Sequence, residues 1–128
     1  AYRNSGAVSL SGSTVTGCSA DWGGVVIAYD SGAVSLKDSI VTDCSADKNG
    51  GVVYAVFSGA VSLIDSFVRN CSAVVGSGGV VSAGYSGAVS ITSSNITGCS
   101  AGKYGGVVYA IGNGAVSIID SDVSDCSA

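Results

Sequence analysis

The chain has 128 residues, enough for one domain, and only 11% of them are charged, with a net charge of −4. This acidic balance, without basic clusters, argues against nucleic acid or an anionic membrane surface as a partner. No apolar run approaches the roughly 20 residues that a membrane-spanning helix needs, so we expect no membrane span.

Three short motifs recur along the chain. GAVS occurs five times, CSA five times and GGVV four times, and successive cysteines are 26, 27, 28 and 27 residues apart. A fixed period of this length is typical of a repeat architecture. The single β-solenoid segment expected over residues 1–128 therefore divides into repeats at 6–31, 32–58, 59–86, 87–113 and 114–128.

One loop in each repeat varies in length, and the other segments do not. The variable loop lies between CSA and GGVV and has two, three, four and three residues in successive copies. Surface loops tolerate insertions, whereas a one-residue slip in a paired strand turns its side chains to the wrong face. The constant segments are therefore expected to be strands locked in register.

These constant segments alternate with a period of two, which is the strand signal. In the second copy, Val34 and Leu36 fall on one face while Ala33 and Ser35 fall on the other. No segment has a helical period. Three short strands per copy, separated by Gly, Ser and Asp turns, predict a right-handed parallel β-helix of about five coils, with like residues stacked one coil apart.

Three ladders of like side chains are expected to fill the core. They are Val8, Val34, Val61, Val89 and Val116; Leu10, Leu36, Leu63, Ile91 and Ile118; and Cys18, Cys44, Cys71, Cys99 and Cys126. A buried thiol behaves as a small hydrophobe, so the cysteines are interpreted as a structural ladder. Without His or CxxC spacing, no metal site is expected.

The repeat resembles the GGA(I/V)/FxxN repeat of chlamydial polymorphic outer-membrane proteins, and related right-handed β-helix repeats in large predicted surface proteins of algae and bacteria. GGVV stands where that family has GGAI, and Val41-Thr42-Asp43-Cys44 stands where it has FxxN, with Cys in place of Asn in every copy. The resemblance covers the whole chain. It implies a right-handed β-helix in a secreted or surface-displayed protein.

Both chain ends fall inside a coil. Ala1-Tyr2 aligns, within one residue, with the end of a GGVVYA strand, and Ala128 closes the last CSA. Open ends would leave apolar rungs and strand edges uncovered. We expect either a segment of a longer array, continued by the same chain, or a unit that associates end to end with itself.

Two sequons for N-glycosylation occur, at Asn70-Cys71-Ser72 and Asn95-Ile96-Thr97. Each asparagine precedes a residue expected to face inward, so its own side chain should face outward. N-glycans are therefore possible partners on secretion, with Asn95 the better acceptor context.

Aspartates at one corner of the coil raise the question of carbohydrate chemistry, since many right-handed β-helices are polysaccharide lyases or hydrolases. Asp38, Asp65 and Asp120 would share a row, but Gly12 and Ser93 interrupt it and the copies are nearly equivalent. We interpret each Asp-Ser pair at this corner as a turn former that bonds its own backbone. No catalytic residue and no cofactor is expected, and the chain is not expected to be an enzyme.

The outward faces offer two further candidates. An apolar stripe, formed by Val25, Val52, Val80, Val107, Tyr54 and Tyr109, is expected to face outward and to pack against another chain or a glycan layer, unless the adjacent loop covers it. A threonine row made of Thr16, Thr42 and Thr97 is broken by Arg69, whereas ice-binding solenoid faces usually carry unbroken threonine ranks.

The sequence thus favours a structural role: an extracellular or cell-surface β-helix segment that forms a rod or fibre. The alternatives are a surface adhesin segment and, further from the pattern, an ice-binding solenoid.

Overall fold

The computed structural model describes residues 2–3, 6–112 and 114–128, and these residues form nineteen strands and no helix. The strands lie in four parallel sheets. The first holds β1 (Tyr2–Arg3), β5 (Val26–Tyr29), β9 (Val53–Val56), β13 (Val81–Gly84) and β17 (Val108–Ile111). The second holds β2 (Val8–Ser11), β6 (Val34–Lys37), β10 (Val61–Ile64), β14 (Val89–Thr92) and β18 (Val116–Ile119).

Two further sheets complete each coil. The third holds β3 (Thr14–Thr16), β7 (Ile40–Thr42), β11 (Phe67–Arg69), β15 (Asn95–Thr97) and β19 (Asp122–Ser124). The fourth holds the two-residue strands β4 (Ser19–Ala20), β8 (Ser45–Ala46), β12 (Ser72–Ala73) and β16 (Ser100–Ala101). The predicted three strands per coil are therefore joined by a short fourth one.

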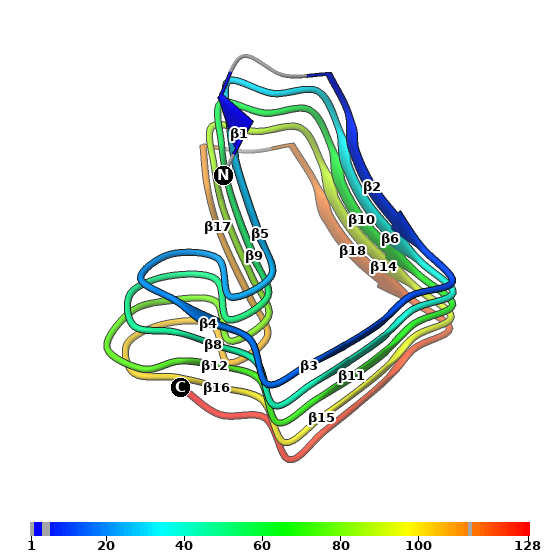
Figure 1. The fold of residues 1–128 in the computed structure, drawn as a ribbon, viewed down its shortest axis with the longest axis vertical. Helices are drawn as coiled ribbons and strands as arrows, with labels where there is room; N and C mark the ends of the chain where they lie inside the picture. Colours follow the sequence, from blue (N-terminus) through cyan, green and yellow to red (C-terminus); the bar gives the residue numbers. More distant parts are fainter. Residues whose placement is uncertain (1, 4–5, 113) are drawn as a thin grey trace.

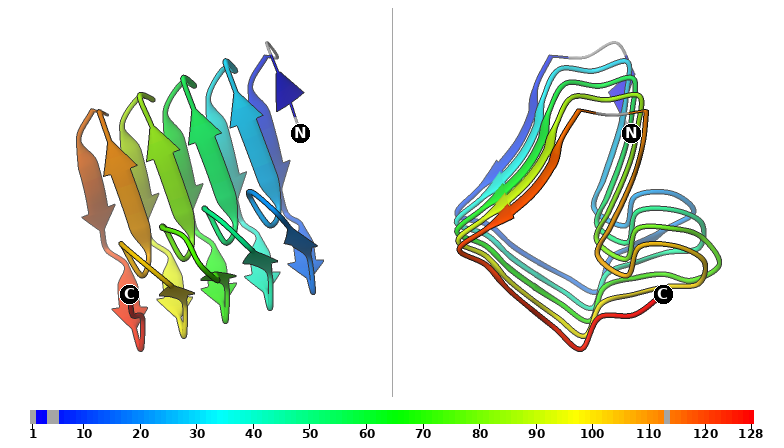
Figure 2. Two further views of the ribbon diagram at one scale, coloured as in Figure 1. Left: turned by 90° about the vertical axis from the view of Figure 1, so that its left-hand side faces the viewer. Right: turned by 180° about the vertical axis from the view of Figure 1, so that it is seen from behind.

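The fold is the predicted right-handed parallel β-helix. Seen from its N-terminal end, the chain runs clockwise while the coils recede toward the C terminus (Figures 1 and 2). There are about four complete turns, from β2 to β17, and β18 and β19 begin a fifth. Each strand pairs in register with its copy one coil away, for example Val34 with Val61 and Val61 with Val89.

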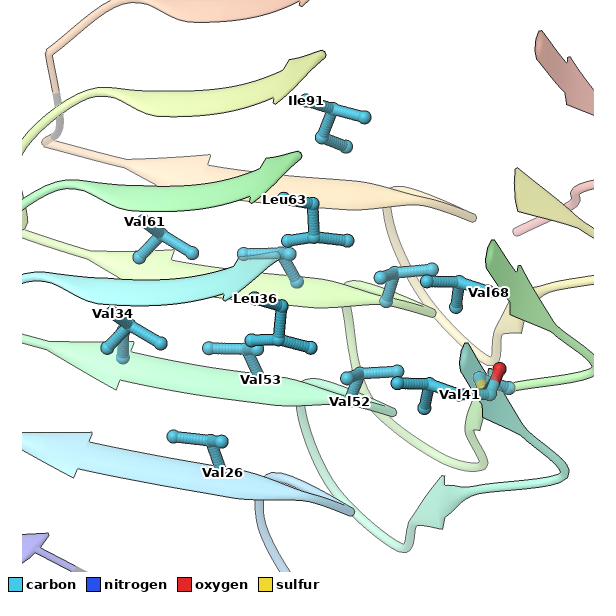
Figure 3. Close-up of a cluster of buried hydrophobic side chains, with 14 of the residues drawn as sticks. Val26, Val34, Leu36, Val41, Val52, Val53, Val61, Leu63, Val68 and Ile91 are labelled. Atoms are coloured by element: carbon cyan, nitrogen blue, oxygen red, sulfur yellow. Dashed lines mark hydrogen bonds between the residues drawn. The ribbon is translucent and has the colours of Figure 1, made fainter. Parts of the chain in front are cut away.

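The core consists of the inward residues of the four sheets, stacked in ladders along the axis (Figure 3). Val34, Leu36 and Val41 are fully buried, as are the equivalent residues of the next two coils. Val8, Leu10 and Val15 in the first coil are only partly buried, because they have a neighbouring coil on one side only. Stacking therefore supplies the burial that a single coil cannot.

The coil turns at residues with left-handed backbone dihedrals that recur at the same place in each copy. One corner carries Gly12, Asp38, Asp65, Ser93 and Asp120, and the next carries Gly17, Asp43, Asn70, Gly98 and Asp125. A third carries Asp30, Phe57, Tyr85 and Gly112, and a fourth the first glycine of each GGVV. Gly, Asp and Asn adopt this conformation most readily, and they occupy all of these positions except those of Phe57, Tyr85 and Ser93.

The prediction that the four valines of the apolar stripe face outward is wrong. Val52 and Val80 are fully buried, and Val25 and Val107 pack partly buried against the core. The chain bends at this position, because the amides of Val25 and Val26 both donate to the carbonyl oxygen of Val52, at 3.0 and 2.9 Å. Two consecutive valines therefore both reach the core, and Figure 3 shows Val52 beside Val53 there.

Candidate functional site

The most distinctive surface is the open C-terminal end of the solenoid. Val116 and Ile118 continue the two aliphatic ladders of the second sheet and are 48% and 47% exposed. Their partners one coil earlier, Val89 and Ile91, have no exposed surface. The end face therefore presents a rung of the core that one more coil would cover.

Backbone edges are open at the same end. β17, β18 and β19 are each the last strand of their sheet and have a hydrogen-bonded neighbour on one side only. At the other end, β1, β2, β3 and β4 are the outermost strands. Both ends thus offer parallel strand edges in the same geometry, which favours pairing with a further coil.

The cysteines follow one another at the same corner of successive coils. Cys44, Cys71 and Cys99 are fully buried, Cys18 and Cys126 are half-buried, and all five thiols are free. Each thiol donates to the carbonyl oxygen two residues earlier, for instance Cys44 to Thr42 at 3.3 Å and Cys126 to Ser124 at 3.2 Å. Side-chain hydrogen bonding with Cys99, and then burial, raise the pKa of Cys71. Burial raises the pKa of Cys44.

The two sequon asparagines lie in different environments. Asn95 is half-buried in β15, beside Phe67 of the neighbouring strand, and lines an outward groove of about 480 Å³ together with Arg69. Asn70 is exposed at a corner with φ of 51°, and its side-chain amide donates to the Asp43 carboxylate at 3.1 Å. Only Asn70 is therefore held by a side-chain hydrogen bond within the described part of the chain.

The aspartate corner contains a second ladder, made of the serine that follows each left-handed residue. The backbone N–H of Ser39 donates to the hydroxyl of Ser66 at 3.2 Å, and that of Ser66 to the hydroxyl of Ser94 at 3.2 Å. Each hydroxyl donates to the carbonyl oxygen two residues back. Of the predicted Asp-Ser pairs, the serine thus makes the corner bonds, while Asp38, Asp65 and Asp120 stay exposed.

The threonine row lies on the outward side of the third sheet. The hydroxyls of Thr42 and Thr16 are 3.1 Å apart, and those of Ser124 and Thr97 are 3.4 Å apart, with Arg69 between the two pairs. On the same face, Ile40 and Phe67 expose large apolar side chains. The face is therefore mixed, with polar and apolar residues side by side.

Sequence reasoning passed over the side chains of the variable loops, which project from one edge of the coil stack (Figures 1 and 2). Tyr54 and Tyr109 do face outward, but loop aromatics pack against them. The Trp22 and Tyr54 rings are 4.8 Å apart, and those of Tyr104 and Tyr109 are 5.8 Å apart. The available signal was the placing of Trp22 and Tyr104 in the length-variable loop, where surface function concentrates.

Comparison with known proteins gives no match among family models, curated proteins or solved structures. Across residues 2–3, 6–112 and 114–128, no helix is long and apolar enough to cross a membrane. Within the same residues, no group of three or more His, Cys, Asp or Glu side chains is arranged to hold a metal ion.

Proposed function

We propose that this chain is a structural segment of an extracellular rod, whose coils are continued at the open ends by further coils of the same kind. The observation that carries the proposal is the half-exposed state of Val116 and Ile118, at ladder positions that are fully buried elsewhere. The further coils come from the same polypeptide or from a second copy of it.

The mechanical role follows from the direction of the bonds. The backbone hydrogen bonds between coils run along the axis, and neighbouring strands are about 4.8 Å apart. Each added coil buries several Val, Leu or Ile side chains, each worth roughly 1.5–3 kcal/mol. Extension along the axis must break whole rungs of such bonds and contacts together, which makes the rod stiff.

An extracellular location is part of the same proposal. It is supported by the resemblance of the repeat to the GGAI/FxxN repeats of polymorphic outer-membrane proteins and by the two outward sequon asparagines. In this role the side chains on the outer faces and any N-glycans decorate the rod, while the core ladders carry its stability.

Electron cryo-microscopy of the native, frozen protein tests the proposal. We expect continuous rods with a rise of about 4.8 Å per coil. An Ile118→Lys variant should stop coils from joining at the C-terminal end, whereas Ile64→Lys, on the outward side of β10, should leave the rods intact. Discrete particles the length of the described coils, or rods that form equally well with Ile118→Lys, would contradict the proposal.

A surface adhesin segment is the second candidate, favoured by the exposed Ile40 and Phe67 beside the threonine row. The same row makes ice binding a further alternative, although Arg69 interrupts it. An ice-shaping assay separates these two, because only an ice binder changes the habit of growing crystals.

A further inference from the structure

Among the variable loops, the structure forms one hollow that breaks the equivalence of the repeats. Its volume is about 350 Å³, and we call it the loop groove; Trp22, Lys48, Asn49, Ser77, Lys103 and Tyr104 are among its lining residues. This size falls within the roughly 300–1,000 Å³ typical of small-ligand sites. The lining residues come from four successive coils, so the groove runs along the axis over roughly 14 Å.

Aromatic rings form the two ends of the groove. Trp22 leans on Tyr54 with an interplanar angle of 42°, and Tyr104 stacks on Tyr109 with an angle of 20°. Each loop ring is thus supported from the sheet behind it. Supported rings hold a fixed orientation, so they lose little side-chain entropy when a ligand stacks on them.

Small residues form the floor between these ends. Gly76 and Ser77 lie buried in one of the two coils whose loops carry no aromatic residue. A Cβ at Gly76 would collide with the backbone of Lys48, so no side chain fits there. The side-chain oxygen of Asn49 accepts the Ser77 N–H at 2.7 Å. The amide nitrogen of Asn49 makes no hydrogen bond within the described residues and remains available as a donor.

The charge of the groove is positive in an otherwise acidic chain. Lys48 and Lys103 are two of the five Lys and Arg residues of the chain, and no carboxylate lines the groove. Asp21 and Asp47 are the chain neighbours of Trp22 and Lys48 and are exposed outside it. The Lys48 ammonium lies 4.9 Å from the Trp22 ring centroid, and that of Lys103 lies 5.4 Å from the Tyr104 centroid.

We propose that the loop groove binds a chain of uronic acid sugars. The apolar face of a sugar ring takes the place of the lysine ammonium over Trp22 or Tyr104, and the displaced Lys48 and Lys103 pair with carboxylates. The lysines belong to loops two coils apart, roughly 10 Å along the axis, with an uncharged floor between them. This spacing fits a linear chain with one charge per sugar better than a compact, multiply charged anion. A carboxylate at C5 also leaves the face of the sugar ring free to stack on an aromatic side chain. Sulfate esters on the ring hydroxyls would crowd that face.

Calorimetric titration of the full chain with tetragalacturonate tests the proposal, with cellotetraose as the neutral control and a κ-carrageenan tetrasaccharide, which carries sulfate but no uronic acid, as the competing anion. We expect tetragalacturonate to bind, with an affinity that falls as salt is added, because salt screens exposed charges. The amide resonance of Ser77 should shift on binding. The cellotetraose and κ-carrageenan titrations should show weaker binding.

Variants locate the site. The pair Lys48→Gln and Lys103→Gln together should weaken tetragalacturonate binding by about tenfold or more. Lys37→Gln and Arg69→Gln together make the same change of charge on β6 and β11, outside the groove, and should leave the affinity unchanged. The proposal is overturned by no binding at millimolar concentration, by equal affinity for cellotetraose, by preference for the sulfated sugar, or by an unaffected double variant. It does not depend on the rod proposal, which these titrations leave unchanged.

Discussion

The thiol of Cys44 donates a hydrogen bond to the carbonyl oxygen of Thr42 at 3.3 Å, just as the hydroxyl of Ser39 donates to that of Lys37 at 2.8 Å. In both cases a residue with a left-handed backbone, Asp43 or Asp38, comes immediately before the donor. The cysteine row is therefore the sulfur counterpart of the corner serine row. This equivalence explains why a small residue with a donor follows the turn residue at both corners.

Because the thiol has a carbonyl partner, Cys44→Ser should be tolerated. We expect it to lower the free energy of unfolding by less than about 1 kcal/mol, since the hydroxyl can make the same bond. The matched control is Val41→Thr, which replaces a methyl group by a hydroxyl of similar size at a fully buried position three residues before Cys44. It should cost about 1–3 kcal/mol. Denaturant unfolding measures both, and an equal cost would contradict the corner interpretation.

Removal of one serine hydroxyl should break the serine row locally. Ser66→Ala leaves the buried N–H of Ser39 without its partner, and an unsatisfied buried donor costs about 1–3 kcal/mol. Ser62→Ala removes a hydroxyl on the outward side of β10 that makes no hydrogen bond to any described residue, and should change stability by less than about 0.5 kcal/mol. Similar melting temperatures for the two variants would refute the proposed role of the row.

The second glycine of GGVV should be irreplaceable. In Gly51→Ala the new Cβ would collide with the carbonyl oxygen of Gly79 in the next coil, so two coils could no longer stack there. We expect loss of the folded state by circular dichroism. Gly84→Ala is the control, because its Cβ meets only side-chain atoms at 3.8 and 3.9 Å. That variant should fold with unchanged or slightly raised stability.

The repeat allowed the fold, its handedness and the register of its strands to be predicted. Period-two alternation places Val34 and Leu36 in the core, and equal repeat lengths stack each residue on its copy. The same alternation failed at Val52, because it assumes a straight strand and the chain bends there. A bend formed by two amides that share one carbonyl leaves no mark in the hydrophobic pattern.

The loop groove could not be predicted for a different reason. Trp22 and Tyr104 are eighty-two positions apart in the sequence, and only the stacking of four coils brings their loops to one hollow. Repeat alignment treats the variable loops as exceptions and discards them. In a solenoid whose core residues repeat from coil to coil, the coils differ mainly in such loop residues.

Alkaline pH should destabilise the fold through the raised pKa values of Cys44 and Cys71. Hydrogen bonding with Cys71 lowers the pKa of Cys99 to about 7, so that thiol acts in the opposite direction below pH 9. The pKa of Cys44 is raised above its ordinary value of 9.0 by burial, so the unfolded state loses this proton first. The stabilisation is complete below pH 9 and should decline above it, by up to about 1.4 kcal/mol per pH unit for each such thiol. Urea unfolding between pH 7 and 10.5, in reductant, measures how the free energy of unfolding changes with pH. Cys44→Ser should make its decline above pH 9 shallower. An unchanged decline would exclude the Cys44 thiol as a source of this pH dependence.

Of the two sequons, Asn95 should carry the glycan and Asn70 should not. The Asn70 amide is held by Asp43, and its oxygen lies only 2.8 Å from where a Cβ at Gly98 would stand, so little room remains around it. Asn95 instead lines an open groove beside Phe67, whose exposed ring can support the first sugar. After expression through a eukaryotic secretory pathway, intact mass should fall by one glycan in Asn95→Gln and stay the same in Asn70→Gln, apart from the substitution itself. A glycan on Asn70 would show that the corner opens more easily than its hydrogen bond implies.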